Sequence, residues 1–420
     1  MSSVLDHSAP RVPARAVDPL SAETAMRALT SQVDYLKGKN YEGHDLFDGL
    51  NSKLFRATPL RHNRLSRLAL IQLCKRSPLN LRAALRVPAG FNPKGGALFL
   101  MGRLNLLRHT GEAAHADEAH GLFRRLQQTA IERPHGLGWG YNFDWQSRAF
   151  YVPEGTPNLV TSVYVGRALL AYHEQFDDRD ALRFALAITD FILSEMIKFE
   201  DLHHVCYNYI PGKDTEVHNA NLLGASHLAR TLSYLPEAKR ADVREKILKS
   251  VLFSISDIQG NGAWPYGTES FHRWVDNFHT AFNIECLLDI GTALKTEQFL
   301  PILQDVTDYY LINMFTPEGV PKYYNNKLYP VDVHVLAEAI IVTRRLRASA
   351  ILVDPARRER IEQTLAGLLI RFQDEAGFFY HQQLSASRWN RISYIRWGQA
   401  WMFYALSICL QAACGLPPLR

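Results

Sequence analysis

The sequence lacks the motifs that mark several common chemistries. No GxGxxG or Walker-type loop, no GxSxG elbow and no HExxH pair occurs in its 420 residues. The five cysteines are scattered, odd in number and without a CxxC pair, which argues against a disulfide framework or a structural zinc site. We therefore expect reduced thiols, no cofactor and no bound metal.

Long apolar runs and blocks of one charge are missing as well. The N-terminus has no apolar stretch of the kind that a signal peptide needs, and no later run reaches the roughly 18 apolar residues of a membrane span. A net charge of +5 without a dominating Lys/Arg block gives no support to nucleic-acid binding. We expect a cytoplasmic protein with no transmembrane segment, in which residues 1–20 form a disordered tail.

What the sequence has is a repeat of aromatic turns, at spacings of 68, 57, 57 and 58 residues. A charged, one-faced segment precedes each turn, and a segment that is apolar nearly all round follows it. These patterns are typical of outer and inner helices. The turns are Trp139-Gly-Tyr141, Tyr207-Asn-Tyr209, Trp264-Pro-Tyr266, Pro321-Lys-Tyr323 and Phe379-Tyr-His381.

The repeat predicts an all-α fold, an (α/α)6 toroid of six outer-inner helix pairs in one domain over residues 21–420. The first pair lacks the aromatic turn and takes residues 60–77 as its outer helix and 92–109 as its inner helix. An additional N-terminal helix is expected over 21–37. Thr156-Pro157 and Asp354-Pro355 give signals for helix starts. An open helical solenoid is the alternative, because local repeats do not prove that a ring closes.

Polar residues stand where the predicted inner helices begin. Aligning these helices places Thr161, Asn219, His279 and Asp332 in one column, with Asn158, Glu216, Asp276 and Tyr329 three residues earlier. Polar side chains without partners are costly in a packed core, so this set is expected to line a wet cavity. N-capping and hydrogen bonds between helices are the structural alternative.

The densest constellation is WPYGTESFHRWVDNFHT, residues 264–280. Asp276 and His279 are three residues apart, which puts them on one helix face. Asp332 and His334 stand at the start of the next inner helix. Proton transfer requires titratable groups of this kind near the reacting hydrogen. A third cluster, GWGYNFDWQSR (138–148), combines aromatic faces with Asp144, which suits a sugar ring with its apolar face and hydroxyl rim. The candidate catalytic residues are therefore Asp144, Asp276, Asp332, His279 and His334.

Aromatic and cationic side chains near these groups are the candidate substrate-binding residues. They are Trp139, Tyr141, Trp145, Arg148, Tyr209, Trp264, Tyr266, Arg273, Trp274, Tyr323 and Arg396. A further basic face is a solvated surface or a contact for an anionic glycan or lipid headgroups. It contains Arg61, Arg64, Arg67, Lys75, Arg76, Arg82 and Arg86.

The helix pairs and aromatic loops resemble the six-hairpin glycosidase superfamily, whose toroids include glycoside hydrolases, polysaccharide lyases and sugar epimerases. YEGHDLFDGLNS, KRSPLNLR, NPKGGALFL and GWGYNFDWQSR resemble proteins of bacterial exopolysaccharide and lipopolysaccharide biosynthesis clusters, some of which carry an aminolevulinate dehydratase label. The resemblance spans the chain from about Tyr41 onward. It implies an oligosaccharide or polysaccharide substrate, anionic or lipid-linked, and peripheral membrane contact.

The leading hypothesis is a carbohydrate-active enzyme that acts on a bacterial surface polysaccharide or its precursor. A glycoside hydrolase would draw its acid and base from Asp144, Asp276 and Asp332. A sugar epimerase or polysaccharide lyase would abstract a proton with His279, His334 or Tyr266 and hold an acid group with Arg148 or Arg273. A non-catalytic glycan-binding or assembly protein is a second class. A terpene-cyclase-like toroid is a third, weakened by the absence of DDxxD and DxDD.

Overall fold

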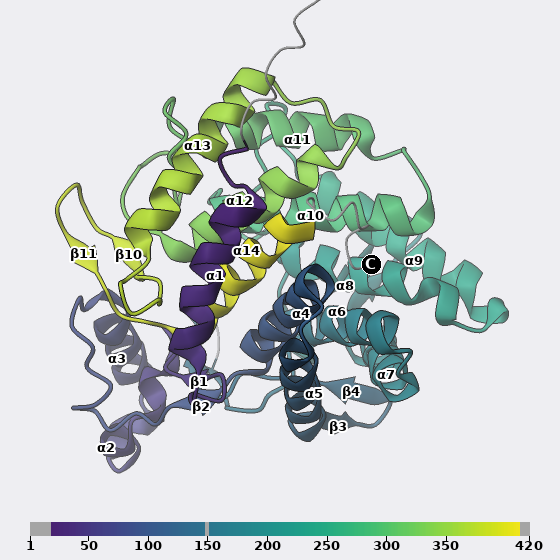
Figure 1. Cartoon of the computed structure of the whole chain (residues 1–420). Coiled ribbons are helices and arrows are strands. Elements are labelled where there is room, and N and C mark those ends of the chain that lie inside the picture. Colours follow the sequence, from purple (N-terminus) through teal and green to yellow (C-terminus); the bar gives the residue numbers. More distant parts are fainter. Residues whose placement is uncertain (1–17, 148–150, 412–420) are drawn as a thin grey trace, which may run out of the picture.

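Six inner helices form a closed ring in the computed structural model, which describes residues 18–147 and 151–411 (Figure 1). Each inner helix packs against the next, and the last packs against the first, so the solenoid alternative is wrong. At the closure a Cβ on Gly102 would lie 2.4 Å from Phe403 Cδ1, so only glycine permits this close approach. The inner helices are α4 (Pro93–Thr110), α6 (Leu159–Phe176), α8 (His218–Thr231), α10 (Asn277–Leu294), α12 (Val333–Arg347) and α14 (Trp401–Gln411), the last preceded by the π-helical segment η5 (Ile395–Ala400).

Six outer helices surround this ring, and each packs mainly on one inner helix. Five of them directly follow their inner partner in the sequence. The sixth, at the N-terminus, packs against α14 and completes the predicted (α/α)6 toroid. The outer helices are α1 (Ala22–Leu36), α5 (Ala113–Gln128), α7 (Arg179–Glu195), α9 (Glu237–Ile255), α11 (Leu300–Asn313) and α13 (Pro355–Phe372).

The predicted outer helix over 60–77 was assigned wrongly. Its residues form η2 (Pro59–His62) and α3 (Arg64–Arg76), and α3 buries only Ile71 and Cys74. The helix expected as an addition, α1, instead buries an apolar stripe against α14, and Gln32 Nε2 donates to Gln399 O at 2.8 Å. The ring therefore closes through residues far apart in the sequence.

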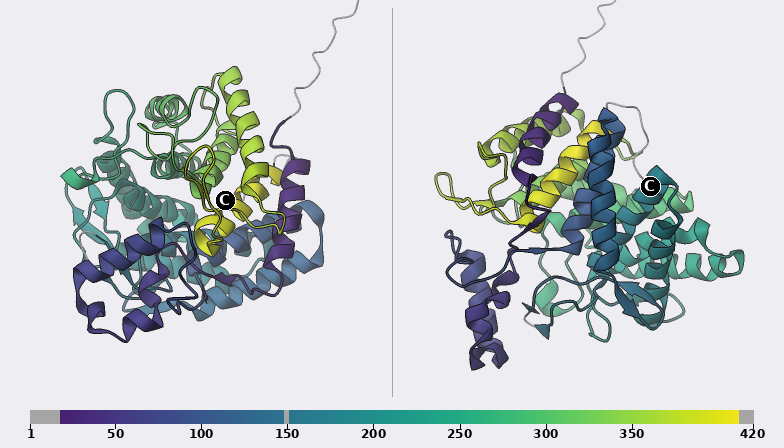
Figure 2. Two further views of the ribbon diagram at one scale, coloured as in Figure 1. Left: turned by 90° about the vertical axis from the view of Figure 1, so that its left-hand side faces the viewer. Right: turned by 60° about the horizontal axis from the view of Figure 1, so that its bottom comes forward.

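Residues 44–89 form an arm that leaves and rejoins the ring at one pair of strands. β1 (Glu42–Gly43) pairs with β2 (Gly90–Phe91) at its base. We call residues 44–89 the basic arm. It contains η1 (Asp48–Asn51), α2 (Lys53–Arg56), η2 and α3, and Figure 2 shows α2 and α3 standing beside the ring rather than in it.

The predicted aromatic turns lie in loops that connect outer to inner helices. These loops carry only short antiparallel strands, consistent with the all-α prediction. The strands are β3 (Ile131–Arg133) with β4 (Gly136–Gly138), β5 (Trp145–Gln146) with β6 (Tyr151–Val152), β7 (Ile197–Glu200) with β8 (Val205–Tyr207), and β9 (Val331–Asp332) with β10 (Gln382–Gln383) and β11 (Trp389–Asn390). Two short 3-10 turns complete the elements, η3 (Leu232–Tyr234) and η4 (Ser270–His272).

Helix caps fix where several helices of both rings begin. Asp354 caps α13 with Pro355 at its first position, as predicted. Thr156 does not cap α6, because Asn158 accepts a hydrogen bond from Thr161 N at 2.9 Å instead. Asp276 and Asp332 are likewise N-caps, of α10 and α12, and so occupy equivalent positions. The sequence alignment placed them in two columns three residues apart, so it was out of register by three residues at α12. The capping alternative is thus confirmed for both carboxylates, which also bind further side chains.

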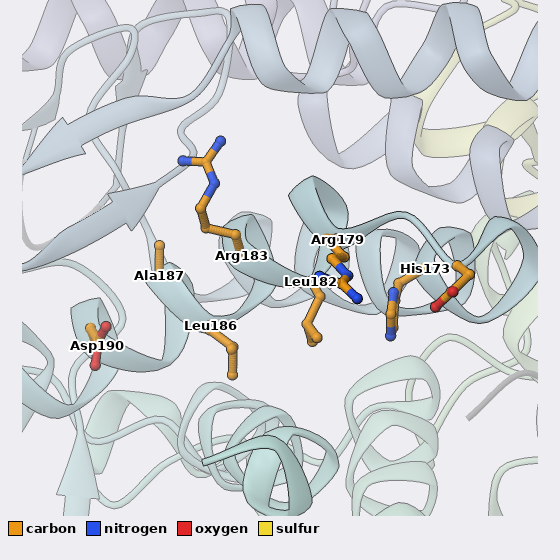
Figure 3. A pocket seen from close by; sticks show the side chains of 8 residues that line it. His173, Arg179, Leu182, Arg183, Leu186, Ala187 and Asp190 are labelled. Carbon is orange, nitrogen blue, oxygen red and sulfur yellow. The ribbon is translucent and has the colours of Figure 1, made fainter. Parts of the chain in front are cut away.

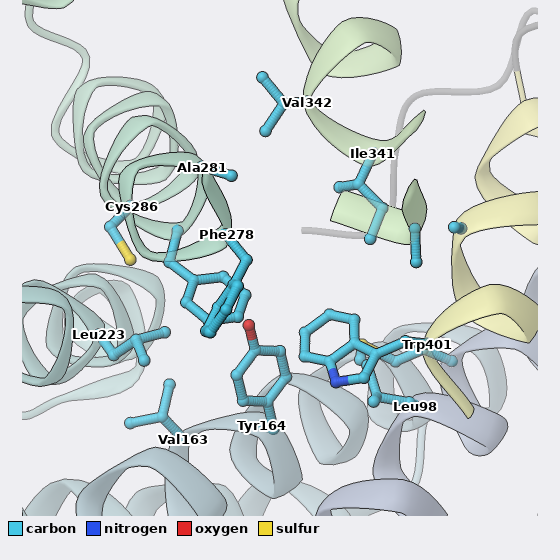
Figure 4. Close-up of a cluster of buried hydrophobic side chains, with 14 of the residues drawn as sticks. Leu98, Val163, Tyr164, Leu223, Phe278, Ala281, Cys286, Ile341, Val342 and Trp401 are labelled. Carbon is cyan, nitrogen blue, oxygen red and sulfur yellow. The ribbon is translucent and has the colours of Figure 1, made fainter. Parts of the chain in front are cut away.

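The centre of the ring is a packed apolar core. Figure 4 shows Tyr164, Phe278 and Trp401 meeting there from three inner helices, with Leu98, Val163 and Leu223 around them. Within the described ranges, no helix combines the length and the apolar composition needed to span a membrane. Of the predicted tail, residues 1–17 lie outside the described part, whereas Asp18 pairs with Arg344 at 2.6 Å.

Candidate functional site

An aspartate-histidine pair stands at the start of α10. Asp276 accepts hydrogen bonds from His279 N and from His279 Nδ1, the latter with 2.7 Å to Oδ2. Because an ionised carboxylate only accepts, Nδ1 carries the imidazole proton and Nε2 is left with its lone pair. Nε2 has no hydrogen-bond partner among the described residues, and the side chain is 21% exposed. This is the geometry of a positioned general base.

Aromatic rings form a wall beside this pair. Tyr266 stacks on Trp274 with ring centroids 4.7 Å apart and lies 4.5 Å from the His279 ring. Trp274 also donates its indole N–H to Asp276 at 3.2 Å, and it keeps 37% of its surface exposed. Tyr323 packs edge-on against Phe278. Burial and the carboxylates of Asp332 and Asp276 raise the pKa of Tyr323 well above the usual range. The wall therefore offers an exposed stacking face next to the candidate base.

A second imidazole, His334, lies inside an aromatic sandwich. Its ring stacks on Phe278 at 4.8 Å and on Trp401 at 4.6 Å, and the edge of Trp397 meets it at 4.5 Å. His334 is buried, and neither ring nitrogen has a partner in the described part of the chain. Both His279 and His334 contact Phe278, so the two imidazoles share one region of the ring. Burial, followed by the charges of Lys94 and Arg396, holds the pKa of His334 well below its usual value.

Glu338 lies one helical turn below His334. Its Oε1 is 3.7 Å from His334 Nε2, and the side chain is fully buried without a hydrogen-bonded donor in the described residues. Burial and the neighbouring Glu285 raise the pKa of Glu338 well above its ordinary range. A carboxyl group that is neutral at pH 7 can give a proton as well as accept one. Glu338, with His334 next to it, is therefore a candidate acid.

Asp332 is bound by three donors. His334 N, Gln382 Nε2 and Trp397 Nε1 lie 2.8, 2.6 and 3.0 Å from its carboxylate oxygens. Burial nevertheless raises the pKa of Asp332 to about 6. His381 Nδ1 lies 3.8 Å from Asp332 Oδ2, and both His381 nitrogens lack a hydrogen-bond partner within the described ranges. Burial lowers the pKa of His381 to about 3.

Lys94 reaches the same region from the first turn of α4. Its Nζ lies 4.2 Å from the ring centre of Tyr164, 4.9 Å from Trp401 and 5.4 Å from Phe282. Burial and the charge of Arg396 hold the pKa of Lys94 well below the usual range, although Glu338 and the three ring faces favour the cation. Lys94 thus supplies an N–H donor at the base of the site.

Arg396 closes the site on the side of the basic arm. Its Nε and Nη2 bind the two carboxylate oxygens of Asp45, each at 2.7 Å, and both side chains are buried. The guanidinium lies 5.2 Å from the Tyr141 ring, and the Tyr141 and Tyr209 hydroxyls are 2.8 Å apart. The arm therefore positions a predicted binding residue.

Ten predicted residues meet in this region. They are Asp276, His279, Asp332, His334, Tyr141, Tyr209, Tyr266, Trp274, Tyr323 and Arg396. Trp139 and Trp264 lie apart from this region, because their rings meet Phe184 and His218 at 6.5 and 6.4 Å, and the two residues are 0% and 1% exposed. Trp139 donates its indole N–H to Leu126 O at 2.8 Å. We correct their assignment from stacking surfaces to core residues.

Four other predicted residues lie elsewhere or are not described. Asp144 binds Arg56 of the arm at 3.2 Å and the backbone N–H of Glu154 at 2.8 Å, so it joins the arm to the following loop. Trp145 is half-buried in β5, 6.2 Å from the Tyr209 ring. Arg273 pairs with Asp257 at 2.5 Å. Arg148 lies outside the described residues. Asp144 and Arg273 are therefore structural in this arrangement.

Sequence reasoning missed several members of the site, and some left a signal. Glu338 follows His334 by four residues on a nearly apolar inner helix, a spacing that puts both on one face. Lys94 is the only lysine of its inner helix, and His381 belongs to the last aromatic turn. No local pattern marks Asp45, because its partner Arg396 is 351 residues away.

A surface groove of about 510 Å³ lies along the outer helix α7 (Figure 3). It begins at His173 near the C-terminal end of α6 and continues along Leu182, Arg183 and Leu186 to Asp190. Arg183 is already paired with Asp180 at 3.0 Å. The groove shares no residue with the site at the start of the inner helices, which carries the unpartnered imidazoles. Across the described residues, no group of three or more His, Cys, Asp or Glu side chains is arranged to hold a metal.

The protonation of Glu338 gives a stability prediction. Glu338→Gln replaces a neutral carboxyl by a neutral amide, so we expect the free energy of unfolding at pH 7 to change by less than about 1 kcal/mol. Glu362, also 0% exposed, accepts Arg347 Nε at 2.7 Å, and Glu362→Gln should lose about 1–2 kcal/mol. Urea denaturation measures both. A larger loss for Glu338→Gln than for Glu362→Gln would show that Glu338 is ionised.

No protein-family profile and no curated protein matches the chain. Solved structures do match its fold. Cellobiose 2-epimerase from Spirochaeta thermophila aligns with a TM-score of 0.57 at 16% identity, over 77% of this chain and 86% of that one. The GH76 α-mannanase from Bacteroides thetaiotaomicron aligns at 0.58 and 9%, over 77% and 87%. D-mannose isomerase aligns at 0.58 and 13%, over 77% and 88%. The similarity confirms the (α/α)6 toroid fold.

Proposed function

We propose that this protein is a bacterial carbohydrate-active enzyme that moves a proton at a sugar carbon next to a carbonyl or carboxylate group, as a sugar epimerase or isomerase does. The observation that carries the proposal is the pair of imidazoles, His279 held by Asp276 and His334 next to Glu338. Among the described residues, His279 Nε2 and both His334 nitrogens have no hydrogen-bond partner. The sugar-active proteins of the same fold support the substrate class.

The proposed reaction begins at His279. Its Nε2 takes the proton from carbon, and Asp276 stabilises the imidazolium that forms. His334, neutral because of its burial, donates an N–H to the oxygen on which negative charge develops, and Lys94 stands near the same place. Return of the proton from His279 to the neighbouring carbon gives an isomer, provided that His334 protonates the carbonyl oxygen and takes the proton of the adjacent hydroxyl. Delivery of the Nδ1 proton of His334 to the opposite face, while Glu338 gives its proton to Nε2, gives an epimer. The proton on His279 then returns to Glu338 through water, which restores both groups. No electron transfer is needed.

The substrate we propose is a bacterial surface polysaccharide or its precursor, anionic or lipid-linked. The stacked rings of Tyr266 and Trp274 would receive the apolar face of a sugar. An anionic sugar such as a uronate has a carboxylate that acidifies the adjacent C–H and can accept a hydrogen bond from the Lys94 amine. We place this reaction in the cytoplasm.

A glycoside hydrolase is the second candidate, and the pKa of about 6 for Asp332 favours it as a source of acid. Hydrolysis also needs a second carboxylate that is free to act on water or on the anomeric carbon. Asp276 is occupied by His279 and Trp274, and Asp144 by Arg56 and Glu154 N. The geometry therefore ranks proton transfer above the hydrolysis that the sequence favours.

Proton NMR in deuterated water tests the proposal. Purified protein would be incubated with reducing sugars and with oligosaccharides from a bacterial surface polysaccharide that contains uronate. Deuterium entering one ring position without chain cleavage is the expected result, and the position distinguishes C2 of a reducing sugar from C5 of a uronate.

Other spectra would overturn the proposal in favour of a named alternative. Shortened chains indicate a hydrolase, and new vinylic signals indicate a lyase. Line broadening without any chemical change indicates a glycan-binding protein, in which the histidines would have a structural role.

A further inference from the structure

The basic arm has an unusual charge distribution. Between Gly49 and Pro88 it contains no acidic residue, although the chain carries 42 Asp and Glu in 420 residues, and the next acid after Asp48 is Glu112. The same forty positions hold nine cationic side chains. They are Lys53, Arg56, Arg61, Arg64, Arg67, Lys75, Arg76, Arg82 and Arg86. Arg82 pairs with Asp48 inside the arm, and Arg56 pairs with Asp144 and Glu154 beside it. Exposed cations such as Lys53, Arg76 and Arg86 give the surface one sign of charge.

Exposed leucines lie among these cations. Five of the thirteen large apolar side chains exposed in the described residues belong to this one segment. On α3, Leu65, Ala69 and Leu73 follow one another at four-residue steps and are all exposed, so they form one stripe of the helix. The opposite side of α3 buries Ile71 and Cys74. The exposed leucines are Leu54, Leu60, Leu65, Leu73 and Leu79, between 46% and 72% exposed.

The cations and the exposed leucines together indicate which kind of partner the basic arm binds. Nucleic acids and sugars are received on aromatic faces, and the large apolar side chains exposed on the described arm are all leucines. Leucines between lysines and arginines instead suit the boundary of a bilayer, where acyl chains receive the apolar stripe and phosphates receive the cations. We propose that the basic arm docks this protein on an anionic phospholipid membrane.

The side of the basic arm that faces the ring contacts residues of the candidate site. Asp45 binds Arg396, and the Phe47 ring meets the Trp397 ring at 5.6 Å. Docking of the outer side therefore brings the candidate site near the membrane surface, where the lipid-linked saccharide of the proposed function would lie. The membrane contact is independent of the proposed reaction, since vesicle binding needs no turnover.

Vesicle flotation of the full chain tests the inference. We expect binding to phosphatidylcholine vesicles that contain phosphatidylglycerol, little binding to pure phosphatidylcholine, and weaker binding as salt rises. Lys53→Gln with Arg76→Gln should weaken binding about twenty-five-fold, because each surface cation contributes about fivefold. Leu65→Ser with Leu73→Ser should weaken it at least about tenfold.

A matched control removes two exposed leucines outside the arm. Leu202→Ser with Leu352→Ser replaces side chains that are 79% and 80% exposed and should bind vesicles like the unchanged protein. Circular dichroism and the unfolding midpoint would show that all variants fold. Absence of binding to anionic vesicles would overturn the inference. So would binding that salt abolishes but that Leu65→Ser with Leu73→Ser leaves unchanged. Binding to a soluble anionic polysaccharide in preference to vesicles would identify a glycan surface instead. The deuterium exchange experiment gives its answer separately.

Discussion

His279→Gln is expected to lower the rate of deuterium exchange into the sugar by about 10²–10⁴-fold. Glutamine preserves the length of the side chain but has no lone pair basic enough to take a proton from carbon. Asp276→Asn should lower the rate by about 10–100-fold, because asparagine retains the N-cap of α10 but does not stabilise an imidazolium by charge. The exchange rate under saturating sugar, followed by NMR, measures both effects.

The matched control for these variants is His203→Gln, an exposed histidine in the loop before β8. It should exchange at the unchanged rate. An active His279→Gln variant would remove His279 from the reaction and leave His334 as the base to be tested next. Equal loss in a folded His203→Gln variant would point to a general effect of histidine removal rather than to the site.

The free energy of unfolding is expected to depend on pH through His381. Its pKa is about 3 in the folded chain and near 6.5 when unfolded, so below pH 6.5 the unfolded chain binds a proton that the folded chain does not. Stability therefore falls as the pH falls, by about 1.4 kcal/mol per pH unit for this group, or about 3 kcal/mol between pH 7 and 4. His334, with its lowered pKa, acts in the same direction.

Asp332 acts in the opposite direction. Its folded pKa of about 6 exceeds the ordinary 3.8, so the folded chain binds the extra proton between these values, and this contribution is lost as the pH rises through 6. His381→Gln should therefore flatten the loss of stability toward acid, and Asp332→Asn should make it steeper by about 2 kcal/mol between pH 7 and 4.

Urea denaturation at pH 7, 6, 5 and 4 measures these slopes. The exposed His203→Gln variant should keep the slope of the unchanged protein. An unchanged slope in His381→Gln would mean that this imidazole is solvated or paired in the folded chain, contrary to its burial.

The sequence predicts the helices well and their partners less well. Inner helices such as α6 and α12 are apolar nearly all round, and such a pattern leaves one environment in which they are stable. An amphipathic stripe predicts that one face of a helix is buried, but it does not identify the helix that covers this face. Both α1 and α3 have such a stripe, and only the non-local contact with α14 shows that α1 is the sixth outer helix.

The same distinction between local patterns and tertiary contacts applies to the residues of the candidate site. The three-residue spacing of Asp276 and His279 is local, and the structure bears out the contact. Alternating aromatics mark Trp139 and Trp264 equally well as core or as binding surface, and burial decides for the core. Asp45 and Lys94 reach the site from other elements, so their position depends on tertiary contacts that a single local pattern does not contain.

The pairing of α1 with α14 has a consequence for biosynthesis. During synthesis α1 leaves the ribosome first and α14 last. Gln32 can form its hydrogen bond to Gln399 only after 367 further residues have been added. At 5–20 residues per second this delay is about 20–70 s, during which the apolar stripe of α1 has no native cover. A nascent chain of this kind is a client for a chaperone that shields its first helix. A circularly permuted chain that begins near Glu42 and places α1 directly after α14 would remove the wait.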